Sequence, residues 1–185
     1  MTTNPRSSVA QGFLTELIKS IRVDLGLAAW GLLANSIAGS PLVPRVLRIP
    51  LLRLAGIRVG RAHVWPSVFF GTRRISIGSQ VTINRQCFFD NHGGITIGDK
   101  VHVGYQVTMF TAVHELGPSE HRCGPATSQP IVIEDGCWIG ARSTIMPGVR
   151  VGRGCVIAAG ALVRENCEPD GLYAGVPARR IRDLH

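Results

Sequence analysis

The chain has 185 residues, 45% of them hydrophobic and 17% charged, which is long enough for one domain with a sizeable core and too apolar for wholesale disorder. The net charge is +8, but the arginines are spread out without a base-stacking or groove-reading motif, so no nucleic acid is expected as a partner. The five cysteines include no CxxC pair, which argues against a disulfide framework or a zinc knuckle and favours a reducing, cytoplasmic location.

Residues 1–57 are expected to form a helical appendage. Apolar residues recur every four positions and predict an amphipathic helix, at Phe13, Leu17, Ile21 and Leu25. A second helical piece is expected over residues 25–38, which is too short to span a bilayer, and prolines at 41, 44 and 50 are expected to break the chain after it. The start of the chain lacks the pattern of a secretory signal. Two interpretations stay open: a cap over one end of the next domain, or peripheral contact with the inner face of a membrane, helped by Arg45, Arg48 and Arg53.

A six-residue period then runs through most of the chain. An aliphatic residue or Met recurs at this spacing, at positions 77, 83, 97, 103, 109, 133, 139, 145, 151, 157 and 163. Four residues after each stands a small or β-branched residue, at 81, 87, 101, 107, 113, 137, 143, 149, 155, 161 and 167. This period is neither helical nor a simple strand alternation. It predicts a triangular coil of 18 residues per turn and about five turns, whose stacked faces bury one another. Glycines that often follow the aliphatic residue are expected to supply corner dihedrals that a Cβ disfavours, at 78, 98, 104, 140 and 152.

The period slips twice. Eight residues separate Phe89 from Ile97, so the His92-Gly93-Gly94 region should bulge outward. Residues 115–132 lack the repeat, are polar and hold three prolines, and a long loop inside a compact domain usually carries function. The repeat places four cysteines in the small inward position, where a thiol acts as a compact hydrophobe, at 87, 137, 155 and 167. Only Cys123, in the loop, is a candidate reactive thiol.

Three short motifs join the repeat in a specific order: TAVHE at 111–115, GCWIG at 136–140 and AGVPARRIR at 174–182. With them, residues 58–182 resemble the hexapeptide-repeat acyltransferases, above all the galactoside and maltose O-acetyltransferase group. The resemblance implies an all-β solenoid, a left-handed parallel β-helix over residues 58–170 with a protruding loop at 115–132 and a coenzyme-binding tail at 171–185. It further implies a homotrimer with active sites between subunits, acetyl-CoA as the donor, direct transfer and no metal.

The same resemblance assigns roles by position. His114 matches the catalytic histidine, and Trp138 matches a tryptophan that lines the groove. Candidate acceptor-binding residues are Asn84 and, where relatives carry an aspartate, His92, with Asp90 and Asn91 as alternatives. Candidate coenzyme contacts are the backbones of Ala141 and Ala159 and the side chains of Arg164, Arg179 and Arg182. Arg164-Glu165 stands where relatives often carry Thr-Lys, and the N-terminal segment differs from the helical module of the sugar enzymes, so the acceptor stays open.

The chemistry suits these residue types. An alcohol attacks a thioester only when its proton is removed, and imidazole titrates near neutrality. A sugar or glycan hydroxyl is the expected acceptor; an antibiotic O-acetyltransferase and a non-catalytic trimeric scaffold are the alternatives, and the length of the acyl group stays open. A γ-type carbonic anhydrase would need two metal-binding histidines five residues apart, and no pair among the six histidines has that spacing.

Overall fold

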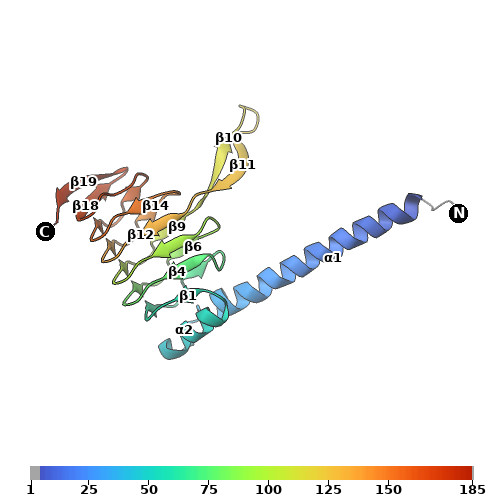
Figure 1. The fold of residues 1–185 in the computed structure, drawn as a ribbon, viewed down its shortest axis with the longest axis horizontal. Coiled ribbons are helices and arrows are strands. Elements are labelled where there is room, and N and C mark those ends of the chain that lie inside the picture. The colour runs from blue at the N-terminus through green and yellow to red at the C-terminus, as the bar shows by residue number, and fades with distance from the viewer. Residues whose placement is uncertain (1–4, 185) are drawn as a thin grey trace.

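The computed structural model describes residues 5–184, with side chains from residue 16 onward, so the side chain of Phe13 and residue His185 lie outside the described part. Helix α1 (Pro5–Gly31) continues into the π-helical turn η1 (Leu32–Ile37), and α2 (Arg45–Leu54) follows. One continuous helix thus replaces the two expected pieces, and most of α1 extends away from the rest of the molecule (Figure 1). Within residues 5–184 no helix combines the length and the apolar character needed to cross a bilayer.

Three parallel sheets form the faces of a triangular coil (Figure 1). The first sheet contains β1 (Arg58–Val59), β4 (Ile75–Ile77), β7 (Ile95–Ile97), β12 (Ile131–Ile133) and β15 (Arg150–Val151). The second contains β2 (His63–Val64), β5 (Thr82–Ile83), β8 (His102–Val103), β13 (Trp138–Ile139), β16 (Val156–Ile157), β18 (Gly171–Gly175) and the antiparallel β19 (Ala178–Asp183). The third contains β3 (Phe69–Phe70), β6 (Phe88–Asp90), β9 (Thr108–Phe110), β14 (Thr144–Ile145) and β17 (Leu162–Val163).

Each turn gives one strand to each sheet, so the five strands of the third sheet correspond to five complete turns. Strand β18 and a bridge between Val151 and Cys167 begin a sixth turn. The fold is the left-handed parallel β-helix that the sequence predicted.

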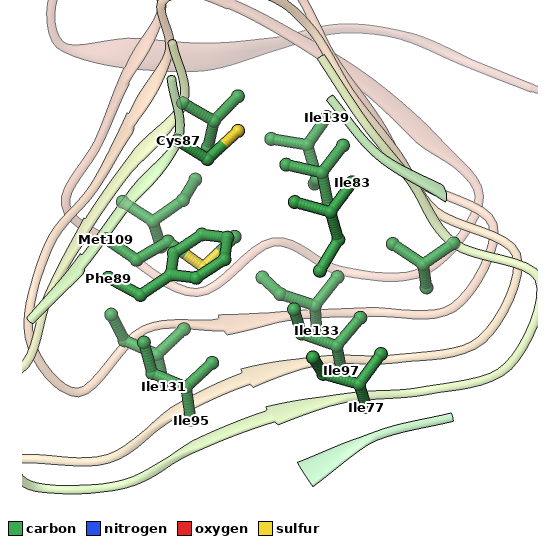
Figure 2. Packing of buried hydrophobic residues seen from close by; sticks show 14 of the residues in the cluster. Ile77, Ile83, Cys87, Phe89, Ile95, Ile97, Met109, Ile131, Ile133 and Ile139 are labelled. Atoms are coloured by element: carbon green, nitrogen blue, oxygen red, sulfur yellow. The ribbon is translucent and has the colours of Figure 1, made fainter. Parts of the chain in front are cut away.

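The six-residue period places equivalent side chains above one another in the interior. Ile77 is in register with Ile97, which is in register with Ile133, and all three are buried (Figure 2). The small positions are inward as expected, with one exception. Val113 is 38% exposed, because the chain has already left the coil at Ala112, the first residue of β10. The expectation that Val113 points into the core was therefore wrong.

The glycines after the aliphatic residues have a different role from the one expected. None of those five has a positive φ; the positive-φ glycines lie elsewhere, for example at Gly136 and Gly160. A Cβ at Gly104 would instead lie 2.6 Å from the backbone nitrogen of Ala141 on the next turn, and one at Gly140 would lie 2.5 Å from that of Ala159. Glycine is required there because successive turns approach too closely for any side chain.

The residues before the β-helix form a cap over its first turn. Ala34, Ala38 and Leu52 are buried in the same core as the first coils. The buried Arg48 guanidinium donates hydrogen bonds to four backbone carbonyls, those of Ala38, Ser40, Val43 and Val64. Pro50 lies inside α2 rather than ending it. η1 and α2 thus pack over the first turn, whereas α1 leaves the body of the protein.

The insertion between the third and fourth turns is an ordered β-hairpin. Strand β10 (Ala112–Leu116) pairs antiparallel with β11 (Cys123–Ser128), and the register shifts between His114 and Leu116. The hairpin projects from the corner between the third and first sheets (Figure 1).

Candidate active site

His114 lies in the first strand of the hairpin with its side chain exposed. Its Nδ1 is 2.9 Å from the carbonyl oxygen of Gly124 on the opposite strand. A carbonyl oxygen only accepts hydrogen bonds, so Nδ1 carries the proton. In the neutral ring Nε2 is then unprotonated and can accept a proton from a substrate.

A groove of about 630 Å³ runs between the hairpin and the outer face of the third sheet. Its hairpin wall includes Ala112, Ala126 and Ser128. Ala126 is the cross-strand partner of His114 and Ala112 is two residues before it, so the side chain of His114 is on the same face of the hairpin as these two residues, next to the residues that line the groove but not one of them. The floor includes Phe69 and Phe88, whose rings stack 4.7 Å apart.

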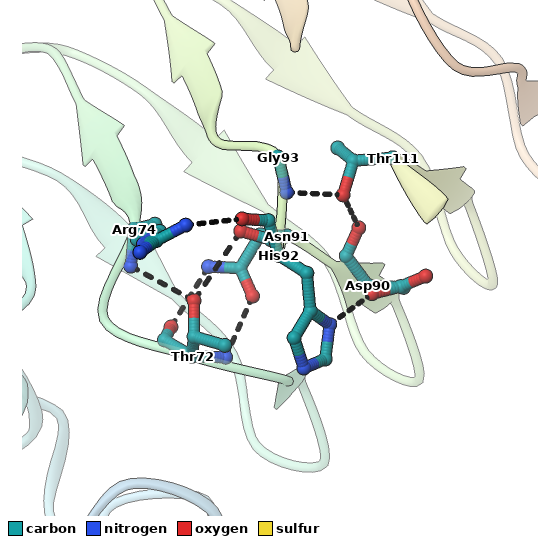
Figure 3. A network of polar contacts seen from close by, with 7 residues as sticks. All are labelled: Thr72, Arg74, Asp90, Asn91, His92, Gly93 and Thr111. Carbon is teal, nitrogen blue, oxygen red and sulfur yellow. Dashed lines mark hydrogen bonds and ion pairs between the residues drawn. The ribbon is translucent and has the colours of Figure 1, made fainter. Parts of the chain in front are cut away.

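Asp90 and His92 form the opposite rim of this groove. Their side chains form a pair in which Nδ1 of His92 is 2.5 Å from Oδ1 of Asp90. Thr111 at the root of the hairpin holds this corner in place, because its hydroxyl donates to the Asp90 carbonyl at 2.7 Å and accepts from the Gly93 N–H at 2.9 Å (Figure 3).

Asn91 has a structural role in place of the acceptor-binding role that the sequence analysis considered for it. The residue is fully buried, and its amide exchanges two hydrogen bonds with the backbone of Thr72, accepting from the N–H at 2.7 Å and donating to the carbonyl at 2.8 Å (Figure 3). Its side chain therefore ties two turns together and is not presented to the groove.

A second group of predicted residues lies on another corner, between the second and third sheets. Asn84 follows β5 and donates to the carbonyl of Val103 at 2.9 Å. Ala141 and Ala159 occupy equivalent places two residues after β13 and β16, so they are stacked on consecutive turns. Among residues 5–184 neither of their backbone N–H groups has a hydrogen-bond acceptor, which leaves both free for a ligand. Trp138, on β13, is 60% exposed.

The basic residues predicted for the coenzyme lie at the far end of the coil. Arg179 and Arg182 are exposed on β19, and Arg164 is exposed just after β17. Arg179 is 3.4 Å from the carboxylate of Glu165, so the acidic departure noted in the sequence partly neutralises this cluster. Arg180, which lies between them in the sequence, donates to Asp183 and to the hydroxyl of Tyr173, and these hydrogen bonds raise its pKa.

The candidate site residues of one chain therefore fall into two separate groups. His114, His92 and Asp90 lie on the hairpin corner, and Asn84, Ala141 and Ala159 on the next corner. Phe69, Phe88 and Thr111 were missed by sequence reasoning, because the repeat gives no sign of which outward residues face the hairpin. Within the described residues no group of three or more His, Cys, Asp or Glu side chains is placed to hold a metal ion.

Known proteins share this architecture. The family "Bacterial transferase hexapeptide (six repeats)" matches residues 130–165. Galactoside O-acetyltransferase of Escherichia coli (strain K12) is 35% identical over 131 residues, which cover 67% of this chain and 62% of that protein. The crystal structure of a hexapeptide-repeat-containing acetyltransferase from Vibrio cholerae aligns with a TM-score of 0.78 and 32% identity over 89% of this chain and 93% of that one. The same Vibrio cholerae protein has been solved with acetyl-coenzyme A, and that structure also aligns with a TM-score of 0.78, at 31% identity over 89% of this chain and 90% of that one.

The fold and the repeat define the class, a β-helical protein of the hexapeptide transferase type. The chain belongs to the hexapeptide-repeat acetyltransferases. The curated relatives are longer: the chain spans between 56% and 62% of the length of three of them.

Proposed function

We propose that this protein transfers an acetyl group from acetyl-CoA to a hydroxyl group of a sugar or glycan, with His114 as the general base. The observation that carries the proposal is the hydrogen bond from Nδ1–H of His114 to the Gly124 carbonyl, which leaves Nε2 as a proton acceptor on the hairpin that forms one wall of a ligand-sized groove. The names of the Escherichia coli and Vibrio cholerae relatives support the reaction class.

In the reaction, Nε2 removes the proton of the acceptor hydroxyl while its oxygen attacks the thioester carbonyl of the donor. The carbon–sulfur bond then breaks, the acetyl ester forms, and the imidazolium returns the proton to the departing CoA thiolate. General-base catalysis of this kind contributes about 10²–10⁴ in rate. The Gly124 carbonyl also faces the imidazolium, so it stabilises the charge that His114 carries between the two proton transfers.

The donor would lie along the corner that bears Ala141 and Ala159. Their free N–H groups fit the amide carbonyls of a pantetheine arm, and Arg164, Arg179 and Arg182 fit the phosphates. The complex of the Vibrio cholerae relative with acetyl-coenzyme A supports this donor.

The acceptor would lie in the groove between the hairpin and the third sheet. The stacked rings of Phe69 and Phe88 offer an apolar floor for the face of a sugar ring, and the Asp90–His92 pair offers polar groups for its hydroxyls. Asn84 lies on a different corner and Trp138 on the outer face of the second sheet, and both would complete the site from a neighbouring subunit of a homotrimer. We also propose, separately from the reaction, that the protein is cytoplasmic and that its N-terminal helix makes peripheral contact with the inner face of a membrane.

The test is release of free CoA thiol from acetyl-CoA across a panel of sugars, oligosaccharides and hydroxylated antibiotics. Turnover with a sugar or glycan, and formation of an O-acetyl ester by mass spectrometry, are expected. Turnover with a hydroxylated antibiotic alone would instead identify the protein as an antibiotic O-acetyltransferase. No thiol release with any acceptor, together with no protection by CoA in thermal melts, would identify a non-catalytic scaffold.

A further inference from the structure

The net charge of the protein is concentrated at one end of the molecule. Residues 25–89 contain eight arginines and no aspartate or glutamate, whereas the remaining twelve basic residues of the chain are matched by twelve acidic ones. Residues 25–89 form the end of α1, the cap and the first two turns of the coil. The whole net charge of +8 therefore lies at the capped end, where α1 also leaves the body (Figure 1).

These arginines have no acidic neighbours to neutralise them. In the part of the chain that the structure describes, none of the eight forms an ion pair with a carboxylate. The guanidinium groups of Arg45 and Arg85 both lie over the Trp65 ring, at 5.7 and 5.3 Å from its centroid. The positive charges of Arg85 and Arg45, after burial, lower the pKa of Arg48. The capped end thus holds like charges close together, which an anionic surface would relieve.

The same end exposes apolar side chains. The inward face of α2 buries Arg48 and Leu52. Its outward face, with the turn before it, leaves Leu42, Val46 and Leu54 90%, 79% and 74% exposed. We call these three residues, with Leu47 and Pro50, the basal surface. Exposed apolar residues continue along α1, at Leu17, Ile18, Ile21, Val23, Leu25 and Leu27.

We propose that the basal surface and the arginines around it bind the surface of a bilayer that contains anionic lipids. Apolar side chains that enter the headgroup region beside cationic ones are the pattern of interfacial membrane binding. A second copy of the chain fits this end poorly, because docking would bring together two sets of arginines that have no carboxylate partner. A nucleic acid would neutralise the arginines but would leave Leu42, Val46 and Leu54 without a role. The proposal is independent of the acetyl-transfer reaction.

The experiment is sedimentation of the full chain with vesicles of phosphatidylcholine alone or mixed with phosphatidylglycerol. The wild-type protein should bind the mixed vesicles, lose binding at high salt and not bind phosphatidylcholine alone. Arg45→Gln with Arg58→Gln should lower the partition coefficient roughly 25-fold, since each arginine near an anionic surface contributes about fivefold. Leu42→Gln with Leu54→Gln should lower it roughly tenfold or more.

The matched control variants change residues far from the basal surface. Arg122→Gln with Arg153→Gln removes the same charge from the hairpin and the last turns, and Leu116→Gln replaces a leucine that is 89% exposed on the hairpin. Both should change binding less than twofold. Acetyl transfer to a water-soluble acceptor should be unchanged in the Leu42 and Leu54 variant, so a failure of the proposed reaction would be visible separately.

Three results would overturn the membrane proposal. The first is absence of binding to the mixed vesicles, and the second is equal binding to neutral vesicles. The third is a wild-type protein that does not bind vesicles and that light scattering shows to form a larger assembly than the Leu42→Gln/Leu54→Gln variant. That result would assign the basal surface to contact with a second copy of the chain.

Discussion

The carbonyl oxygen of Gly124 accepts a hydrogen bond from Nδ1 of His114 across the β10–β11 hairpin, at 2.9 Å. The register of the two strands shifts immediately after His114, and such irregularities often re-aim a side chain next to an active site. The local geometry of the hairpin therefore selects the tautomer of His114 in which Nε2 is the unprotonated, basic nitrogen.

The Asp90–His92 pair is expected to position the acceptor. Asp90→Asn should weaken the 2.5 Å contact to Nδ1 of His92 and free the ring to rotate. The KM for the acceptor should rise roughly tenfold, as for loss of a hydrogen bond to a charged group, while kcat changes little. Steady-state kinetics with varied acceptor measure this. Glu120→Gln, at the exposed tip of the hairpin, serves as the control, and a fall in kcat alone would contradict a positioning role.

Two glycines separate the effect of turn stacking from that of backbone dihedrals. Gly104 has no positive φ, but its Cβ would lie 2.6 Å from the Ala141 nitrogen, whereas Gly160 has a φ of +72° and open space around it. Gly104→Ala should lower the free energy of unfolding by about 1–3 kcal/mol or more because the turns must separate. Gly160→Ala should cost about 1 kcal/mol of left-handed strain. Urea unfolding of both variants measures these losses. A larger loss for Gly160→Ala than for Gly104→Ala would favour the backbone-dihedral explanation instead.

The buried thiols should make the fold sensitive to alkali. Burial raises the pKa of Cys87 from 9.0 to about 11 and those of Cys137 and Cys167 to about 12. Above pH 9 the unfolded chain loses protons that the folded protein retains, so the free energy of unfolding should fall from about pH 9 towards pH 12. Urea titrations at several pH values measure the slope.

Substitution identifies which thiols are responsible. Cys137→Ala should make that decline shallower, and the matched Cys123→Ala, on the exposed hairpin, should not. At pH 8 a thiol reagent should label only Cys123 in the folded protein and all five cysteines in urea. Labelling of a second cysteine without denaturant would contradict the assignment of the other four to the interior.

Arg48 is expected to hold the cap on the first turn. It donates to four backbone carbonyls from a buried position, and Arg48→Met would leave those acceptors unsatisfied. Loss of about 3 kcal/mol or more is expected, since each buried unsatisfied group costs about 1–3 kcal/mol. Arg53→Met removes only two such hydrogen bonds, to Val59 and Gly60 at the edge, and should cost less. Equal melting temperatures for the two variants would show that the cap does not depend on Arg48.

Much of the fold could be predicted because each six-residue period of the sequence corresponds to one strand and one corner of the coil. Two residues in every six face the interior, and Ile77, Ile97 and Ile133 mark the same face on three successive turns. The insertion could be located but not described, because pairing of β10 with β11 depends on cross-strand contacts that follow no repeat. Val113 fitted the period by chance, after the chain had left the coil.

The site could be predicted only in part for a related reason. His114 stood out beside an interruption of the repeat, and the family motifs marked Trp138 and Arg179. Asn91 and His92 are neighbours with similar polarity, yet one is buried against Thr72 and the other lines the groove. Which of two adjacent polar residues faces inward at a corner depends on backbone dihedrals, and the sequence does not display them.

The most direct measurement compares His114→Ala with His121→Ala, a histidine exposed on the same hairpin, by CoA thiol release with a saturating acceptor. We expect turnover of the His114 variant to fall at least about 100-fold, with little change in melting temperature and with unchanged CoA binding, while the His121 variant keeps wild-type activity. Comparable turnover of the two variants would contradict the assignment of His114 as the base.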